Sequence, residues 1–318
     1  MQGNRPKFIL ELIAGLTLFT TQSTAQPPRF TTIDVPNSVF TVARAVNSAG
    51  AIVGWFIDDT AFKHHGYLRS ADGQITQVDF NNDPAQATEA LGLSDAGDIV
   101  GDYRDTAGRK RGFLLSGGTF SSFDPPGSFS TVPHSINSNG DIVGFFSDNS
   151  GTGLHGFLVN KNNLSSFTIL DFPGATYSLA TAINDSGEIV GLHGDSNFVD
   201  HGFVRSPAGL YSALKDAPGV DTDPWGISNS GLVAGFYDEF GGAALVNGFT
   251  LPNGRDFPTP KALFHAFVLQ GDSLTLVNIS GVGGGINTGI FGIRDDGVIV
   301  GQYNSPDGHT HGFVGTPK

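Results

Sequence analysis

A nine-residue motif recurs six times along the chain, and this repetition constrains the fold more than any other feature. Each copy starts at an aliphatic residue, passes through a polar turn that ends in glycine, and finishes with a sequence of the Ile-Val-Gly type. The copies occupy 46–54, 93–101, 136–144, 183–191, 227–235 and 293–301. A recurring unit of about 45 residues is typical of propellers, solenoids and arrays.

Four short extended segments are predicted in each unit. The first ends in an Ile-Asn step, the second is the Ile-Val-Gly-x-aromatic run, the third has the His-Gly-Phe-Leu type, and the fourth ends in Phe-Asp. Between the first two, a glycine such as Gly140 accepts the positive φ of a bulged hairpin turn. Four antiparallel strands in a unit of this length match one blade of a propeller.

The two ends of the repeat predict how the units are joined. The last unit stops after its third segment, at Phe313 and Val314, whereas 30–34 reads as a fourth segment without the first three. A propeller closes its ring in this way, while a solenoid needs a polar cap at each end. We therefore expect an all-β, six-bladed β-propeller that forms a single domain over 26–318, with 30–34 pairing into the last blade.

Composition excludes several classes of function. The chain has 45 glycines, no cysteine and a net charge of −13. The lack of cysteine excludes disulfides, thiol catalysis and Cys-ligated zinc. The negative charge disfavours nucleic acid, which is bound mainly through Lys and Arg. We expect a monomer that binds a glycan or a protein, and no nucleic acid.

The first 25 residues are typical of an export signal. Arg5 and Lys7 precede an apolar stretch over 8–19, and 23–25 supplies small residues for cleavage. The alternative is a retained amphipathic segment. We expect a signal peptide over 1–25 and a secreted protein, extracellular or periplasmic, with no membrane span after cleavage.

The repeated segments resemble a known bacterial family. The His-Ala-Phe sequence at 265–267, its His-Gly-Phe variants and the Ile-Asn-x-x-Gly-x-Ile-Val-Gly run are similar to the probable extracellular repeat named HAF for its His-Ala-Phe signature. The resemblance extends from residue 30 to the end, with Arg111 replacing one histidine. It implies an exported bacterial protein and brings no established activity.

Two polar residues recur once per unit, and we interpret both as structural. The histidine of the third segment, replaced by Arg111 in one unit, is expected to bond an aspartate of its own or the neighbouring blade. An acidic residue also follows each Ile-Val-Gly glycine by four positions, except in the last unit, and is expected to cap a turn. Calcium is the alternative ligand of these carboxylates. The acidic positions are Asp58, Asp105, Asp148, Asp195 and Glu239.

Departures from the repeat are where we expect binding. The glycines at 235 and 301 are 66 residues apart, against 43 to 47 elsewhere, which places an insertion over 239–264 in the fifth blade. The loop face that carries this insertion is the predicted binding face, because loops on a rigid scaffold commonly carry function.

The residue two positions before each Ile-Asn step also varies, although its neighbour is always small. These residues are expected on the first strands, nearest the axis: Arg44, Leu91, His134, Thr181, Trp225 and Phe291. Trp225 with Asp221 and Asp223 could form a corner that stacks on sugars or accepts cations. The alternative is that Trp225 fills the core.

The leading hypothesis is a non-enzymatic binding or interaction propeller. One alternative is a metal-dependent hydrolase or lyase with an axial site, which needs Glu89, His134, His193 and Asp223 to converge on one ion. Another alternative is a purely structural surface component. The candidate ligand-binding residues are Arg44, Glu89, His134, His193, Asp223 and Trp225.

Overall fold

The structure is a computed structural model that describes residues 29–80, 87–150, 153–238, 264–277, 286–306 and 308–316. The predicted signal peptide and residues 239–263 of the predicted insertion lie outside this described part. Every regular element in it is a β-strand. No helix in these ranges has the length and apolarity needed to cross a membrane.

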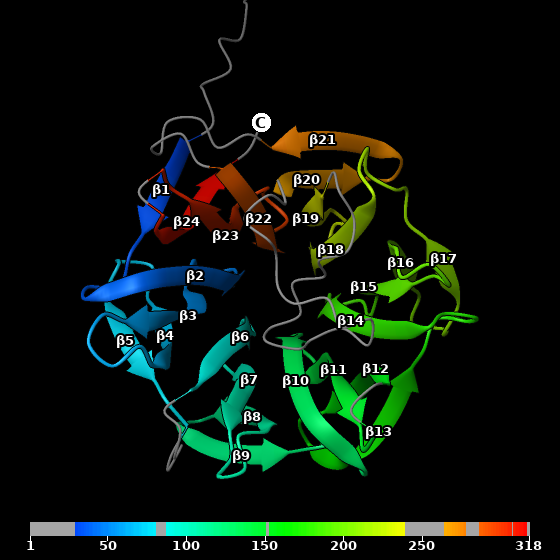
Figure 1. The fold of residues 1–318 in the computed structure, drawn as a ribbon, viewed down its shortest axis with the longest axis horizontal. Coiled ribbons are helices and arrows are strands. Elements are labelled where there is room, and N and C mark those ends of the chain that lie inside the picture. The colour runs from blue at the N-terminus through cyan, green and yellow to red at the C-terminus, as the bar shows by residue number, and fades with distance from the viewer. Residues whose placement is uncertain are drawn as a thin grey trace, which may run out of the picture.

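Four sheets of four antiparallel strands surround a central axis (Figure 1). The first comprises β6 (Glu89–Leu93), β7 (Ile99–Arg104), β8 (Lys110–Ser116) and β9 (Thr119–Phe123). The second comprises β10 (Ser128–Ile136), β11 (Asp141–Asp148), β12 (Leu154–Asn160) and β13 (Asn163–Leu170). The third comprises β14 (Tyr177–Ile183), β15 (Ile189–Gly194), β16 (Asp200–Arg205) and β17 (Tyr211–Ala213). The fourth comprises β18 (Asp221–Ile227), β19 (Val233–Asp238), β20 (Phe264–Gln270) and β21 (Ser273–Val277).

The remaining eight strands form one larger sheet that contains both ends of the described chain. One part comprises β2 (Ser38–Val46), β3 (Ile52–Asp58), β4 (His64–Arg69) and β5 (Ile75–Val78). The other comprises β22 (Ile286–Ile293), β23 (Ile299–Asn304), β24 (Thr310–Thr316) and β1 (Arg29–Ile33). A single parallel bridge, between Phe40 and Thr310, joins the two parts. The fold is therefore all-β and propeller-like, with sheets arranged in a ring.

The predicted pairing of 30–34 with the last strand is present. β1 runs antiparallel to β24, with Phe30 opposite Gly315 and Ile33 opposite Gly312. The Phe30 ring also packs edge-on against Phe313, with centroids 5.8 Å apart. Sequence-distant strands thus complete the same sheet.

The turn glycines have the predicted conformation. In the turn from β10 to β11, Gly140 has a φ of 80° and donates its N–H to the Asn137 carbonyl at 3.0 Å. The Asn137 side chain accepts the N–H groups of Asn139 and Asp141. The positive φ explains the glycine, because a Cβ is disfavoured there.

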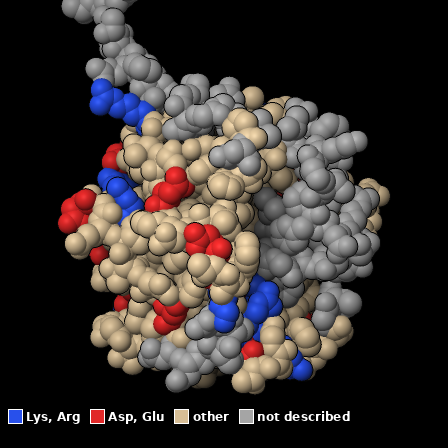
Figure 2. Space-filling model, turned by 60° about the vertical axis from the view of Figure 1, so that its left-hand side comes forward, with Lys and Arg blue, Asp and Glu red and all other residues tan. Residues whose placement is uncertain are grey.

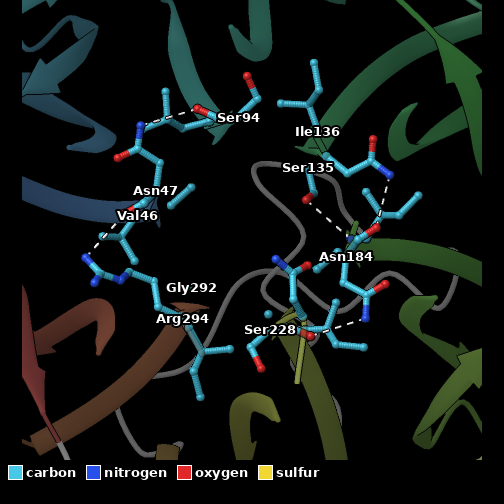
Figure 3. A pocket seen from close by; sticks show the side chains of 18 of the residues that line it. Val46, Asn47, Ser94, Ser135, Ile136, Asn184, Ser228, Gly292 and Arg294 are labelled. Carbon is cyan, nitrogen blue, oxygen red and sulfur yellow. Dashed lines mark hydrogen bonds between the residues drawn. The ribbon is translucent and has the colours of Figure 1, made fainter. Parts of the chain in front are cut away.

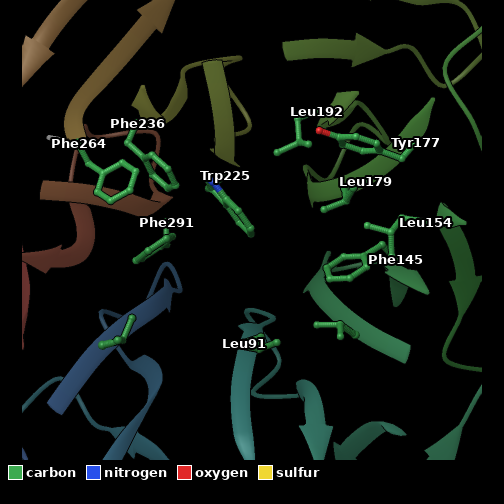
Figure 4. Close-up of a cluster of buried hydrophobic side chains, with 12 residues drawn as sticks. Leu91, Phe145, Leu154, Tyr177, Leu179, Leu192, Trp225, Phe236, Phe264 and Phe291 are labelled. Atoms are coloured by element: carbon green, nitrogen blue, oxygen red, sulfur yellow. The ribbon is translucent and has the colours of Figure 1, made fainter. Parts of the chain in front are cut away.

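Aromatic residues of the third strands fill the space between sheets. Each is at most 1% exposed, and burying such a ring contributes about 1.5–3 kcal/mol. They are Tyr67, Phe113, Phe157, Phe203, Phe267 and Phe313. A further apolar cluster lies around the axis and includes Trp225, Phe291, Leu91 and Phe145 (Figure 4).

Candidate functional site

A cavity of about 270 Å³ opens on the axis of the ring. Its walls come from β2, β6, β10, β14, β18 and β22 together with the turns that follow them (Figure 3). These inner strands contact one another in that order, and β22 contacts β2. The cavity opens where the inner strands end, so it faces away from the end of β19 and the start of β20.

Each inner strand has a β-bulge at its variable residue. The register of β2 against β3, for example, passes from Ala43–Gly54 to Ala45–Val53 and skips Arg44. The same skip occurs in every other inner strand. The skipped residues are Arg44, Leu91, His134, Thr181, Trp225 and Phe291, and all six line the cavity. A bulge re-aims a side chain, which explains why these residues escape the repeat.

The glycine of the Ile-Val-Gly sequence accommodates this bulge. Gly191 pairs with Ala180, the residue before the bulge at Thr181. A Cβ on Gly191 would lie 2.0 Å from the Leu179 carbonyl oxygen and 2.6 Å from the Phe203 ring. Glycine within a strand commonly marks a bulge or a close backbone approach. This was the signal in the sequence that could have predicted the bulges.

Small residues after the bulge let the inner strands pack closely, as predicted. A Cβ on Gly92 would lie 2.9 Å from the His134 carbonyl oxygen and from the Ser135 Cα. A Cβ on Gly292 would lie 3.0 Å from the Arg44 carbonyl oxygen. The narrow axis therefore depends on the missing side chains.

Three layers of residues line the cavity from its floor to its mouth. The bulge residues form the floor. An aliphatic layer follows two positions later in each strand and comprises Val46, Leu93, Ile136, Ile183, Ile227 and Ile293. Polar turn residues form the mouth, and the Asn47, Asn137 and Asn184 amides donate to carbonyls of the next turn along.

The mouth also carries carboxylates. Asp95, Asp185 and Asp295 lie on alternate turns and accept the backbone N–H of Ser48, Ser138 and Ser230, respectively. These bonds tie neighbouring sheets together. Together with Asp296 these aspartates outnumber Arg294, the cation that also lines the mouth, and so make the entrance mainly negative.

Arg44, His134, Trp225 and Phe291 meet at the floor. An Arg44 Nη2 donates to His134 Nδ1 at 3.0 Å. The guanidinium carbon lies 4.1 Å from the centre of the Phe291 ring and 5.0 Å from that of Trp225. His134 in turn packs edge-on against Trp225 at 5.0 Å. The structure thus brings together three of the six predicted ligand-binding residues.

The hydrogen bond at the floor defines the state of His134. A guanidinium has only donors, so His134 Nδ1 must accept, and the ring proton is on Nε2. Burial, followed by the positive charges of Arg44 and Lys110, holds the pKa of His134 well below its usual range. His134 is therefore neutral, with its Nε2–H available to donate.

Three buried nitrogens at the floor have no hydrogen-bond partner. They are Arg44 Nε, His134 Nε2 and Trp225 Nε1. Burial lowers the pKa of Arg44 to about 10, opposed by the charges of Glu89 and Asp102, so the guanidinium stays protonated at neutral pH. Buried polar groups in native proteins are normally bonded, and three of the eleven unsatisfied buried side-chain atoms in the described residues gather in this layer.

Trp225 is only 3% exposed and packs in the axial cluster with Phe236 and Phe291. The alternative that it fills the core therefore describes its packing. The cation nearest its ring is the chain's own Arg44.

Glu89 belongs to a separate buried ion cluster. Its carboxylate binds Lys110 Nζ at 3.1 Å and His64 Nδ1 at 3.0 Å, and Lys110 also binds Asp102 at 3.1 Å. Burial alone would raise the pKa of Glu89, but Lys110 and His64 outweigh burial and lower the pKa to about 2. Burial raises the pKa of Asp102 to about 7, and the Glu89 charge adds to this while Lys110 opposes it. The cluster lies at the end of β6 away from the cavity mouth.

Asp223 lies in a group of buried acids and not in the cavity. Burial, followed by Asp200, Asp221 and Asp238, raises the pKa of Asp223 well above its usual range. Its Oδ1 has no hydrogen-bond partner. Asp200 accepts a hydrogen bond from the Tyr177 hydroxyl. Burial and the neighbouring acids therefore disfavour the charged form of the Asp223 carboxyl.

His193 is remote from the cavity lining. Its ring stacks on Phe172 with centroids 3.8 Å apart and an interplanar angle of 5°. Glu89, His134, His193 and Asp223 are the residues that the alternative of an axial metal site needs, and each of these side chains has different neighbours, so the structure does not bring the four together. Among the residues that the structure describes, no group of three His, Asp or Glu side chains could hold a metal ion.

The repeated histidine bonds an aspartate, as expected, in four of its five copies. Nδ1 of the histidine bonds the aspartate that follows the fourth strand of the same sheet, at 2.7–3.3 Å. The pairs are His65–Asp79, His155–Asp171, His201–Asp216 and His311–Asp34. Arg111 substitutes with ion pairs to Asp105 at 2.9 Å and Asp124 at 3.6 Å. The last pair fastens β24 to the end of β1.

The repeated acidic residue caps its turn in every described copy. Asp195 Oδ1 accepts the N–H groups of Asn197 and Val199, and the same pattern of capping recurs in the other sheets. The described caps are Asp58, Asp105, Asp148 and Asp195. Glu239 lies outside the described residues. Calcium stays the alternative ligand that the sequence suggests for these carboxylates.

The side of the ring in Figure 2 carries its charged side chains as scattered, mostly single groups of both signs among uncharged residues. The axial cavity is defined by its six inner strands and by the buried donors at its floor.

Comparisons with known proteins bear on the fold. No model of a known protein family matches the sequence, and no curated protein matches it. The structure of TolB from Acinetobacter baumannii is similar, with a TM-score of 0.51 and 14% identity over 75% of this chain and 54% of TolB. The chain thus spans about half the length of TolB. A prolyl endopeptidase structure is also similar, with a TM-score of 0.50 and 13% identity over 83% of this chain and 39% of that one. At these identities the likeness shows the propeller fold alone.

Proposed function

We propose that the chain is an exported propeller that binds a small ligand in its axial cavity. The observation that carries this proposal is the floor, where three buried N–H groups lack acceptors. Leaving a buried donor unsatisfied costs about 1–3 kcal/mol. A bound molecule that supplies acceptors offsets this cost, which gives the arrangement a purpose that packing does not.

The architecture in this proposal is a six-bladed ring. The eight-stranded sheet counts as two blades, because each half repeats the four-strand pattern and only the Phe40–Thr310 bridge joins them. The β1–β24 pairing is then the closure of the ring. Export, membership of the HAF repeat family and a monomeric state complete the proposal and are supported by the sequence.

The proposed binding face differs from the one that the sequence suggested. β19 ends and β20 begins at the rim opposite the cavity mouth. Residues 239–263 of the insertion lie outside the described part of the chain. The cavity is preferred because its residues, contacts and unsatisfied atoms are defined.

A thermal-shift screen with a blocked cavity tests the proposal. Wild-type protein is heated with separate sets of neutral sugars, amines, carboxylates and divalent cations, since a ligand of the folded state raises the unfolding temperature. Leu91→Trp replaces a leucine of the floor with a bulky indole ring, and Leu210→Trp is the control at a residue that is 71% exposed. We expect at least one set to stabilise wild type and Leu210→Trp but not Leu91→Trp. Equal shifts in both variants would place binding outside the cavity.

A further inference from the structure

The floor of the axial cavity offers donors and one positive charge, and this combination indicates the chemistry of its ligand. Arg44 Nε, His134 Nε2 and Trp225 Nε1 are all N–H groups, given that His134 Nδ1 accepts from Arg44. None of these three atoms can accept a hydrogen bond. A ligand group at the floor must therefore present acceptors.

Among the described residues, no adjacent carboxylate neutralises the charge of Arg44. Within the described ranges no carboxylate forms an ion pair with Arg44, and the acids that influence it electrostatically are Glu89 and Asp102. Both of those acids are bonded to Lys110. A buried guanidinium without an ion-pair partner favours an anionic acceptor, because charge-assisted hydrogen bonds are the strongest kind available to it.

The layers above the floor restrict the rest of the ligand. The aliphatic layer from Val46 to Ile293 offers contacts to an apolar body and few polar groups. The aspartates at the mouth, Asp95, Asp185 and Asp295, repel anions. Like charges disfavour a dianion more than a monoanion. The volume of about 270 Å³ is below the range of about 300–1,000 Å³ that holds drug-sized ligands.

We propose that the axial cavity binds a small monocarboxylate with an apolar body, whose carboxylate accepts hydrogen bonds from Arg44, His134 and Trp225. This inference rests on the proposed function and names the class of its ligand. Carboxylate and guanidinium match in geometry, and the aliphatic layer covers the apolar body.

Three probes of one shape test the charge requirement by calorimetric titration of the whole protein. Benzoate is the anion, benzamide the neutral isostere and benzylamine the cation. We expect benzoate to bind at least about tenfold more tightly than either of the others, since hydrogen bonds between charged groups exceed neutral ones by this much. Phosphate and sulfate are expected to bind more weakly than benzoate.

Two variants locate the binding. Arg44→Met is expected to remove the preference for benzoate, and the exposed Arg109→Gln is its matched control and retains it. Trp225→Phe keeps an aromatic ring but loses one donor, and is expected to weaken benzoate several-fold while leaving benzamide less affected. It also serves if Arg44→Met fails to fold.

The outcomes separate the two proposals. If benzamide or benzylamine binds as tightly as benzoate and Leu91→Trp abolishes that binding, the cavity is a binding site and the monocarboxylate inference is overturned. If benzoate binds equally to wild type, Arg44→Met and Trp225→Phe, the carboxylate is not at the floor. If no probe and no member of the wider screen binds, the proposed function itself fails.

Discussion

Ionisable side chains on the outer strands and at the axis differ in whether they recur from sheet to sheet and in how they are paired. The outer pairs, such as His155–Asp171, recur from sheet to sheet, are partly exposed and have their partners close by. The axial groups occur once each: Lys110 is shared by two buried acids, while Arg44 has unsatisfied hydrogen-bonding capacity. The repeat thus supplies interactions that hold the ring together. Of the exceptions, Lys110 compensates two buried acids, whereas Arg44 holds the charge that we assign to binding.

The largest effect is expected from Lys110→Met. This change leaves Glu89 and Asp102 buried without their shared cation. Removing one partner of a buried ion pair typically costs about 3–5 kcal/mol. Urea unfolding monitored by tryptophan fluorescence measures the loss, and a loss below about 1 kcal/mol would show that the cluster is hydrated or neutral.

A methyl group opposite a bulge is expected to cost less. In Gly191→Ala the new Cβ meets the Leu179 carbonyl, so the bulge at Thr181 must shift. Overpacking of this kind costs about 1–3 kcal/mol. Gly174→Ala is the control, because nothing lies within 4 Å of its Cβ and only its φ of 84° opposes the change. A loss for Gly191→Ala no larger than that for Gly174→Ala, which is opposed only by its φ, would mean that the close approach at Gly191 is relieved at little cost.

The strands, turns and side-chain bonds that recur from sheet to sheet could be predicted well from the sequence. Period and pattern indicated the strands, Gly140 indicated its turn, and the recurrence of His155 with Asp171 indicated their bond. Each of these follows from residues within one unit, whose local geometry is the same in every copy.

The contacts among side chains at the axis could be predicted only in outline. The sequence identified Arg44, His134 and Trp225 as variable residues near the axis, but their mutual contacts depend on bulges in separate strands. Glu89 and His193 were grouped with them because a sequence gives no direction for a side chain. Lys110 was missed, since its partners lie on adjacent strands and no motif marks it.

The smallest effect concerns the turn caps and depends on pH. The Ser150 hydroxyl, together with the N–H groups of Gly153 and Ser150, lowers the pKa of Asp148 although partial burial opposes this. A carboxyl with a lowered pKa in the folded state contributes stability above its unfolded pKa of about 3.9. That contribution is lost as pH falls further.

We therefore expect Asp148→Asn to be less stable than wild type at a pH of about 6. The difference in their free energies of unfolding should shrink as the pH falls from about 6 to about 3. Thermal unfolding at a series of pH values measures the difference. A deficit that stays constant over this range would mean that Asp148 titrates alike in the folded and unfolded chains.

The central claim is that residues of the repeat stabilise the ring, whereas Arg44 is retained for binding. The most direct test compares the unfolding midpoints of Arg44→Met and Arg111→Met in the absence of ligand. Arg44→Met removes a buried charge and its desolvation cost, but it also loses the hydrogen bond to His134 and the contacts with the Phe291 and Trp225 rings. These effects oppose each other, so we expect Arg44→Met to stay close to wild type. Arg111→Met loses its ion pairs to Asp105 and Asp124 and is expected to fall by up to about 1 kcal/mol. A larger loss for Arg44→Met than for Arg111→Met would contradict the claim, because Arg44 would then be a structural residue.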